Sequence, residues 1–116
     1  MYIDQDSGIM IHNDDNINSM RKAGKLAAEV LDHIIPFVIP GVTTEALDKE
    51  CHKFILKNNA VPAPLNYKGF PKSICTSINH VICHGIPGEK ILINGDIVNI
   101  DVTVILDGWQ IGRAHV

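Results

Sequence analysis

Hydrophobic residues recur about every 3.6 positions between Ile17 and Ile35, which predicts an amphipathic helix of roughly five turns. Charged residues hold most of the other face, and they are Arg21, Lys22, Lys25, Glu29 and Asp32. A carboxylate at Asp14 or Asp15 can accept the unpaired backbone N–H groups at the start of this helix. Pro36 cannot continue the helical hydrogen bonding, so we expect the helix to end near it.

A second helix is expected after the Ile-Pro-Gly breaker at residues 39–41, with Thr43 as its cap. Its apolar positions follow the i, i+4, i+7, i+8 spacing of a single helical face, and they are Leu47, Cys51, Phe54 and Ile55. Asn58 and Asn59 suit its C-terminal end. Residues 60–64 include two prolines, which indicates an extended loop.

From residue 73 onward the pattern alternates with a period of two, as in strands. It predicts a short strand at 73–78, a turn at Asn79 and His80, a further extended run at 81–84 and a turn at 94–96. The β-branched run at 97–106 is typical of a central strand, and Asp107-Gly108 indicates a hairpin turn. Two helices followed by a mainly antiparallel sheet define an α+β fold. Only residues 109–116 are left for the second hairpin strand, so the sheet looks truncated.

Composition narrows the class of protein. The 116 residues suffice for one domain, and 46% hydrophobic with 20% charged residues excludes a disordered or fibrous chain. A net charge of −3 argues against a nucleic-acid partner, and no apolar run is long enough for a membrane span. The first residues carry acids where a signal peptide carries bases, so we expect a cytoplasmic protein. Cys51, Cys75 and Cys83 form no CxxC pair, and we expect reduced, mostly buried thiols.

Asp101 is the residue that the strand pattern does not explain. It lies inside the β-branched run, where an unpaired buried carboxylate would cost several kcal/mol. Alternation places it on one sheet face with Asn99 and Thr103, and it places the apolar residues Ile100, Val102 and Val104 on the other. The polar face is either a solvated surface or a metal site, because carboxylate oxygens suit divalent cations.

Two further segments are candidates for chemistry. His84 stands where an extended run enters the Gly-Ile-Pro loop at 85–87, a place that can present an imidazole to a cleft. A surface histidine is the alternative. Residues 67–71 form an aromatic loop with a glycine, which either walls an apolar pocket or folds over the core.

Three ordered blocks give these residues a family context. Residues 66–79 read NYKGFPKSICTSIN, residues 83–87 read CHGIP, and residues 94–103 read NGDIVNIDVT. With the helical segments MRKAGKLAA at 20–28 and PGVTT at 40–44, they closely resemble type I methionine aminopeptidases of bacteria. The resemblance runs from about Asn16 to Trp109.

The resemblance implies the pita-bread fold, with two α/β halves related by a pseudo-twofold axis. It implies removal of the initiator methionine from nascent polypeptide N-termini at the ribosome by a cytoplasmic enzyme that is monomeric at full length. It also implies two divalent metal ions (Co, Mn, Fe or Zn) held by two Asp, one His and two Glu. Asp101 matches the first metal ligand, His84 the catalytic histidine that contacts the substrate, and Tyr67, Phe70 and Cys75 the walls of the methionine pocket.

The chain departs from this pattern at its end. The family's second aspartate lies eleven positions after the first, where this chain has Gly112, and the other three ligands would lie in a second half. Residues 110–116, QIGRAHV, resemble one reading frame of a sequencing-library adapter, and a natural frameshift or truncation is the alternative. We therefore divide the chain into an N-terminal extension at 1–15, with Met10 as an alternative start, a family segment at 16–109 and a non-family tail at 110–116.

Two expectations follow for the chain by itself. With one ligand of five, we expect it to hold no metal pair and to lack aminopeptidase activity. A non-catalytic pita-bread binding module is the alternative function, although such a module has no chemical need for His84, Asp101 and the aromatic loop together. A proline-specific or creatine-cleaving relative fits the CHGIP block less well.

Overall fold

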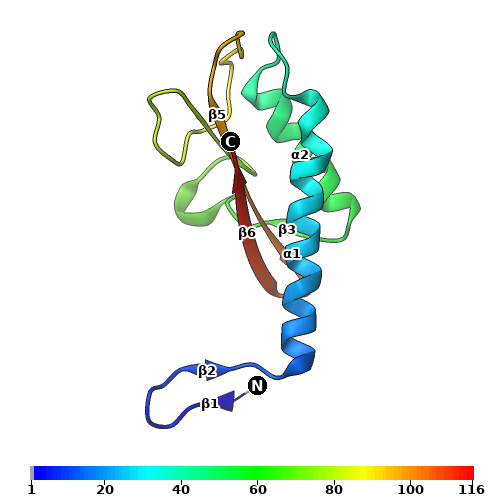
Figure 1. The fold of residues 1–116 in the computed structure, drawn as a ribbon, viewed down its shortest axis with the longest axis vertical. Coiled ribbons are helices and arrows are strands. Elements are labelled where there is room, and N and C mark those ends of the chain that lie inside the picture. Colours follow the sequence, from blue (N-terminus) through cyan, green and yellow to red (C-terminus); the bar gives the residue numbers. More distant parts are fainter. Residues whose placement is uncertain (1) are drawn as a thin grey trace.

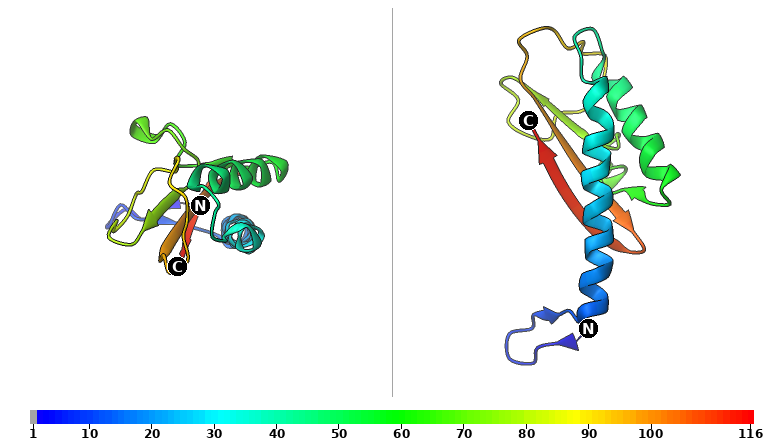
Figure 2. Two further views of the ribbon diagram at one scale, coloured as in Figure 1. Left: turned by 90° about the horizontal axis from the view of Figure 1, so that it is seen from above. Right: turned by 45° about the vertical axis from the view of Figure 1, so that its right-hand side comes forward.

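The computed structural model describes residues 2–116, and its two helices lie on one side of an antiparallel sheet (Figures 1 and 2). In chain order the elements are β1 (Tyr2–Ile3), β2 (Met10–Ile11), α1 (Asp14–Ile34), the 3₁₀ turn η1 (Ile35–Phe37), α2 (Thr44–Lys57), β3 (Val61–Pro62), the 3₁₀ turn η2 (Tyr67–Gly69), β4 (Cys75–Ile78), β5 (Val98–Leu106) and β6 (Trp109–His115). Helix α1 contacts β5 and β6, and α2 contacts α1 and β3. No helix within residues 2–116 combines the length and apolar character that a membrane crossing needs.

The two helices begin and end largely where the sequence predicts. The cap of α1 is Asn13 rather than Asp14 or Asp15, because Asn13 and Asn16 each accept the other's backbone N–H through their side chains. The two aspartates occupy the first turn instead, where negative charge favours the helix dipole. Thr43 caps α2 as expected, by accepting the Ala46 N–H at 3.1 Å.

Strand β5 is the centre of the sheet. Asp101 pairs with Cys75 of β4 on one side and with Ala114 of β6 on the other. Val104 pairs in the same way with Pro62 of β3 and with Ile111 of β6. Strands β3 and β4 therefore follow one another along one edge of β5, and β6 alone occupies the other edge.

The predicted alternation along β5 is confirmed. Ile100, Val102 and Val104 are buried against the helices, whereas Asn99, Asp101 and Thr103 are half-buried on the opposite face. The core between helices and sheet consists of Leu26, Ala27, Val30, Leu31, Ile34, Leu47, Cys51, Ile55, Ala60, Ile74, Ile78, Leu92, Ile100, Val102 and Val104. The face of the sheet that carries Asp101 is thus the one that the helices do not cover.

A histidine adds a polar contact between the helices. His33, in the last turn of α1, lies 2.9 Å from Glu50 of α2 through Nε2 and Oε1, and its ring stacks on Phe54 at 4.3 Å between centroids. This contact fixes how α1 crosses α2 at the end next to η1.

Four expectations from the sequence are corrected. Residues 81–84 are irregular rather than extended in a strand: the chain turns directly after β4 (Val81 N–H to the Ile78 carbonyl), and it is Gly85 that contacts the edge of β4 opposite β5. Residues 61–62 form the short strand β3 where a loop was expected, and residues 2–11, for which no strand was predicted, form the β1–β2 hairpin. Cys83 is exposed, whereas Cys51 and Cys75 are buried as expected.

The predicted hairpin turn is present, and the tail completes the hairpin. Asp107 and Gly108 both have positive φ (51° and 81°), as a type I′ turn requires. Residues 109–115 then form β6, which pairs with β5 along its whole length. Residues 110–115 of the predicted non-family tail therefore occupy the strand position that the hairpin needs.

We expect the 116-residue chain to self-associate at micromolar concentrations through β6. Within residues 2–116, β6 pairs with β5 only, so the N–H and C=O groups that alternate residues of β6 direct to its outer edge are free to pair with another chain. Light scattering after size exclusion should show a mass above 12.7 kDa that rises with concentration.

A matched pair of variants tests whether β6 is the cause. Gln110→Lys with Ala114→Lys places charge on exposed β6 positions and should return the chain toward the monomer. Asn18→Lys with Ala46→Lys adds the same charge on exposed helix positions and should leave association unchanged. Equal effects of the two pairs would show that net charge, and not the strand edge, controls association.

Candidate active site

Asp101 is a half-buried carboxylate in the middle of β5. Within residues 2–116, no hydrogen bond or ion pair occupies its oxygens. Its oxygens are not among the fully buried unpaired side-chain atoms of residues 2–116, so the carboxylate keeps contact with solvent. A half-buried carboxylate on the face that the helices leave open is compatible with both the solvated and the metal interpretation of this face.

A second oxygen on this face is also unsatisfied. Asn99 lies two residues before Asp101 on the same face, and its Oδ1 is buried without a hydrogen-bond partner among residues 2–116. Buried polar atoms are paired in the great majority of cases, and an ordered water or an ion supplies the partner where the protein does not. Both atoms are hard oxygen donors of the kind that divalent cations bind.

Strand β4 pairs with β5 next to Asp101. Cys75 stands directly opposite Asp101, and Ser77 opposite Asn99. Burial raises the pKa of the Cys75 thiol to about 11, and the Asp101 charge adds to the effect. The thiol stays protonated at neutral pH, where it contributes a small apolar surface instead of a thiolate ligand.

His84 lies in the irregular segment next to β4. Its side chain is exposed, and its backbone adopts φ of +55°, which is uncommon for a residue other than glycine. The following residue is anchored to the strand: the Thr76 N–H donates to the Gly85 carbonyl at 2.9 Å, and the Gly85 N–H donates to Ser77 Oγ at 3.1 Å. The segment that carries His84 therefore lies along one edge of β4, and β5 with Asp101 lies along the other edge.

The aromatic loop has a defined turn. Tyr67 begins η2, and the Phe70 N–H donates to the Tyr67 carbonyl at 2.9 Å. Tyr67 is 64% exposed, Phe70 is half-buried and Cys75 is buried. The shared methionine pocket of these three residues stays a prediction.

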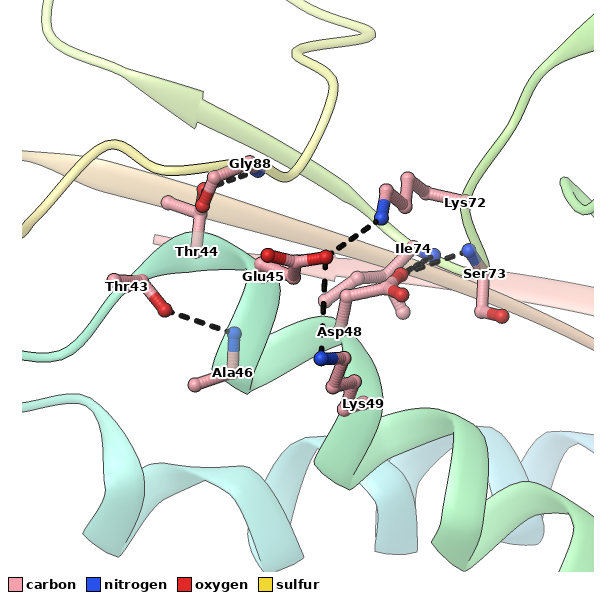
Figure 3. A network of polar contacts seen from close by, with 10 residues as sticks. All are labelled: Thr43, Thr44, Glu45, Ala46, Asp48, Lys49, Lys72, Ser73, Ile74 and Gly88. Carbon is pink, nitrogen blue, oxygen red and sulfur yellow. Dashed lines mark hydrogen bonds and ion pairs between the residues drawn. The ribbon is translucent and has the colours of Figure 1, made fainter.

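A network at the start of α2 holds the neighbouring loops, and sequence reasoning missed it (Figure 3). Buried Asp48 accepts the N–H groups of Ser73 and Ile74 through Oδ1, at 2.8 and 3.0 Å. Thr44 Oγ1 accepts the Gly88 N–H at 2.8 Å. The available signal was helical spacing, since Asp48 lies three residues before Cys51 and seven before Ile55, on their buried face.

A partly buried ion pair completes this network. Lys72 Nζ lies 3.2 Å from Glu45 Oε1 (Figure 3), and hydrogen bonding to this ammonium together with its charge lowers the pKa of Glu45. Together these contacts join α2 to the start of β4 and to the loop after His84, so the helix sets the position of both segments.

These residues alone do not fit a two-ion site. Within residues 2–116, no three His, Cys, Asp or Glu side chains lie close enough together to hold a metal ion. Gly112 pairs with Thr103 and so lies on the same face as Asp101, two pairs along the ladder. The position where the resemblance places the second aspartate is therefore on the correct face, but this chain has no carboxylate there.

Solved structures define the class of this protein. A crystal structure of methionine aminopeptidase from Rickettsia prowazekii superposes on 92% of the chain with a TM-score of 0.89 and 65% identity, and 44% of that structure is covered. The chain therefore has the N-terminal part of the pita-bread fold, as the sequence predicts.

The sequence comparisons then give the family. The model of metallopeptidase family M24 matches residues 18–112, and the chain belongs to this family. The methionine aminopeptidase of Rickettsia prowazekii (strain Madrid E) is 69% identical over 101 residues, and that of Escherichia coli (strain K12) is 56% identical over 104. These matches cover 87% and 88% of the chain but 39% of each relative, so the chain spans about two fifths of the relatives' length.

Proposed function

We propose that the complete protein to which this chain belongs removes the N-terminal methionine from nascent polypeptides in the cytoplasm. The observation that carries the proposal is Asp101, a half-buried carboxylate on the sheet face that the helices leave open, with no hydrogen-bond or ion-pair partner among residues 2–116. The 69% identity to a methionine aminopeptidase supports the substrate class.

Each candidate residue has a role that its environment supports. Asp101 supplies a metal ligand, while divalent ions in this class activate water and polarise the peptide carbonyl. His84, on its anchored segment, offers an exposed imidazole that can donate or accept a hydrogen bond near the scissile peptide. Tyr67, Phe70 and the protonated Cys75 thiol supply aromatic and sulfur surface that suits a thioether side chain.

A chimaeric enzyme tests the function. Residues 1–109 of this chain, joined to the part of the Rickettsia prowazekii relative that follows its matched segment, should release methionine from a Met-Ala peptide with Co²⁺ or Mn²⁺. The 116-residue chain by itself should release none, because it brings one carboxylate to the metal face. Turnover by the chain alone would show that its ligand set is larger than Asp101.

The same assay decides between the enzyme and a non-catalytic binding module. A folded chimaera that binds the peptide and metal without releasing methionine would contradict the enzymatic proposal. Release of methionine at rates typical of enzymes would exclude the binding module.

A further inference from the structure

We propose that Ser77 is a positioning residue for His84. Its buried hydroxyl holds Gly85 and thereby fixes the direction in which the segment presents the imidazole. The inference rests on the proposed function, in which His84 contacts the substrate.

The conformation of His84 requires an external constraint. A φ of +55° is unfavourable for a side chain with a Cβ, and it persists only where surrounding contacts hold it. The side chain is exposed, so burial of the imidazole does not supply that constraint. The constraint must come from the backbone on either side.

Gly85 supplies the constraint on the C-terminal side. Its carbonyl accepts the Thr76 N–H at 2.9 Å, and its own N–H donates to Ser77 Oγ at 3.1 Å. A Cβ at this position would collide with the Thr76 carbonyl oxygen, so the segment lies as close to β4 as a backbone can. Within residues 2–116, the Ser77 contact is the one side-chain hydrogen bond made to residues 83–86.

The strand that carries Ser77 also carries the neighbours of Asp101. Ser77 is 4% exposed, and it pairs with Asn99 while Cys75 pairs with Asp101. One rigid strand therefore relates the His84 segment to the candidate metal ligand. Loss of the Ser77 hydroxyl should loosen this relation without removing any group that touches substrate.

The expected kinetic signature is a change in kcat alone. A catalytic group that is displaced by even about 1 Å loses much of its effect on the transition state, whereas ground-state binding through the methionine pocket is retained. In the chimaera, Ser77→Ala should lower kcat by about tenfold and leave KM within about twofold.

A second readout does not depend on activity. In the full 116-residue chain, the Gly85 amide hydrogen should exchange at least about tenfold more slowly than an unprotected amide, and Ser77→Ala should accelerate that exchange about fivefold. Ser73→Ala is the matched control, because Ser73 is an equally buried serine whose hydroxyl lies 2.7 Å from His52 Nδ1 instead. It should change neither kcat nor Gly85 exchange.

The outcomes separate this inference from the proposed function. Methionine release by the parent chimaera with unchanged kcat in Ser77→Ala would overturn the role of Ser77 and leave the function standing. An unprotected Gly85 amide in the parent chain would overturn it without any kinetic measurement. An inactive parent chimaera would overturn the function itself, whatever the exchange rates show.

Discussion

Asp101→Asn in the chimaera is expected to lower methionine release by about 10²- to 10³-fold, because a metal ligand contributes several kcal/mol to transition-state stabilisation. Asparagine has nearly the same shape, so the β5 ladder and its packing should survive. The change removes the negative charge that compensates a divalent cation. Activity with saturating Mn²⁺, together with the metal content after gel filtration, measures the effect.

Asp107→Asn is the matched control for this substitution. Asp107 lies six residues further along, in the hairpin turn, where φ is +51° and asparagine is well tolerated. This variant should retain full activity and metal content. If Asp101→Asn also kept both, Asp101 would not be a metal ligand, and the unpaired carboxylate would need another explanation.

The second large effect is expected on stability. Asp48→Ala should lower the free energy of unfolding by about 3–5 kcal/mol, because two hydrogen bonds to a carboxylate are lost and two buried N–H groups are left unpaired. The bonds join the second turn of α2 to the residues just before β4, at 2.8 and 3.0 Å (Figure 3). Domains of this size have only about 5–15 kcal/mol of stability, so the variant should be largely unfolded in mild urea.

Two further variants define the cause of this effect. Asp48→Asn keeps an oxygen that can accept the N–H groups, and it should lose clearly less stability than the alanine variant. Glu45→Ala removes the neighbouring ion pair with Lys72 and should have a small effect. Urea unfolding monitored by circular dichroism, at a concentration below self-association, gives the comparison. Equal losses for Asp48→Ala and Glu45→Ala would show that the buried hydrogen bonds are unimportant.

Much of the fold follows from local sequence. The apolar period of α1, the Thr43 cap and the Asp107-Gly108 turn each depend on residues within a few positions of one another. Such local interactions have the same physics in the free chain and in the folded protein. The face of β5 that Asp101 occupies was predicted for the same reason, because alternation along a strand is a property of the backbone itself.

Two segments differ from their predicted structure, because long-range strand pairing and not local sequence determines their conformation. Residues 81–84 have the alternation of a strand, but they pair with no strand within residues 2–116, and the edge of β4 opposite β5 is contacted by Gly85 instead. Val61 and Pro62 read as loop because of the neighbouring prolines, and yet β5 pairs with them. Neither outcome is encoded within the segment, since a strand exists only where a partner edge is available.

For the site, the sequence by itself determined the candidates: Asp101, His84 and the aromatic loop, and the family that their blocks indicate. Only the tertiary structure showed that Asn99 Oδ1 is buried without a partner among residues 2–116, that Asp48 anchors the start of β4, and that Ser77 holds the residue after His84. The hydrogen bonds of Ser77 and Asp48 connect residues that lie 8 to 26 positions apart in the chain. Whether a buried polar atom is satisfied depends on which distant groups folding brings to it, and no local pattern records that.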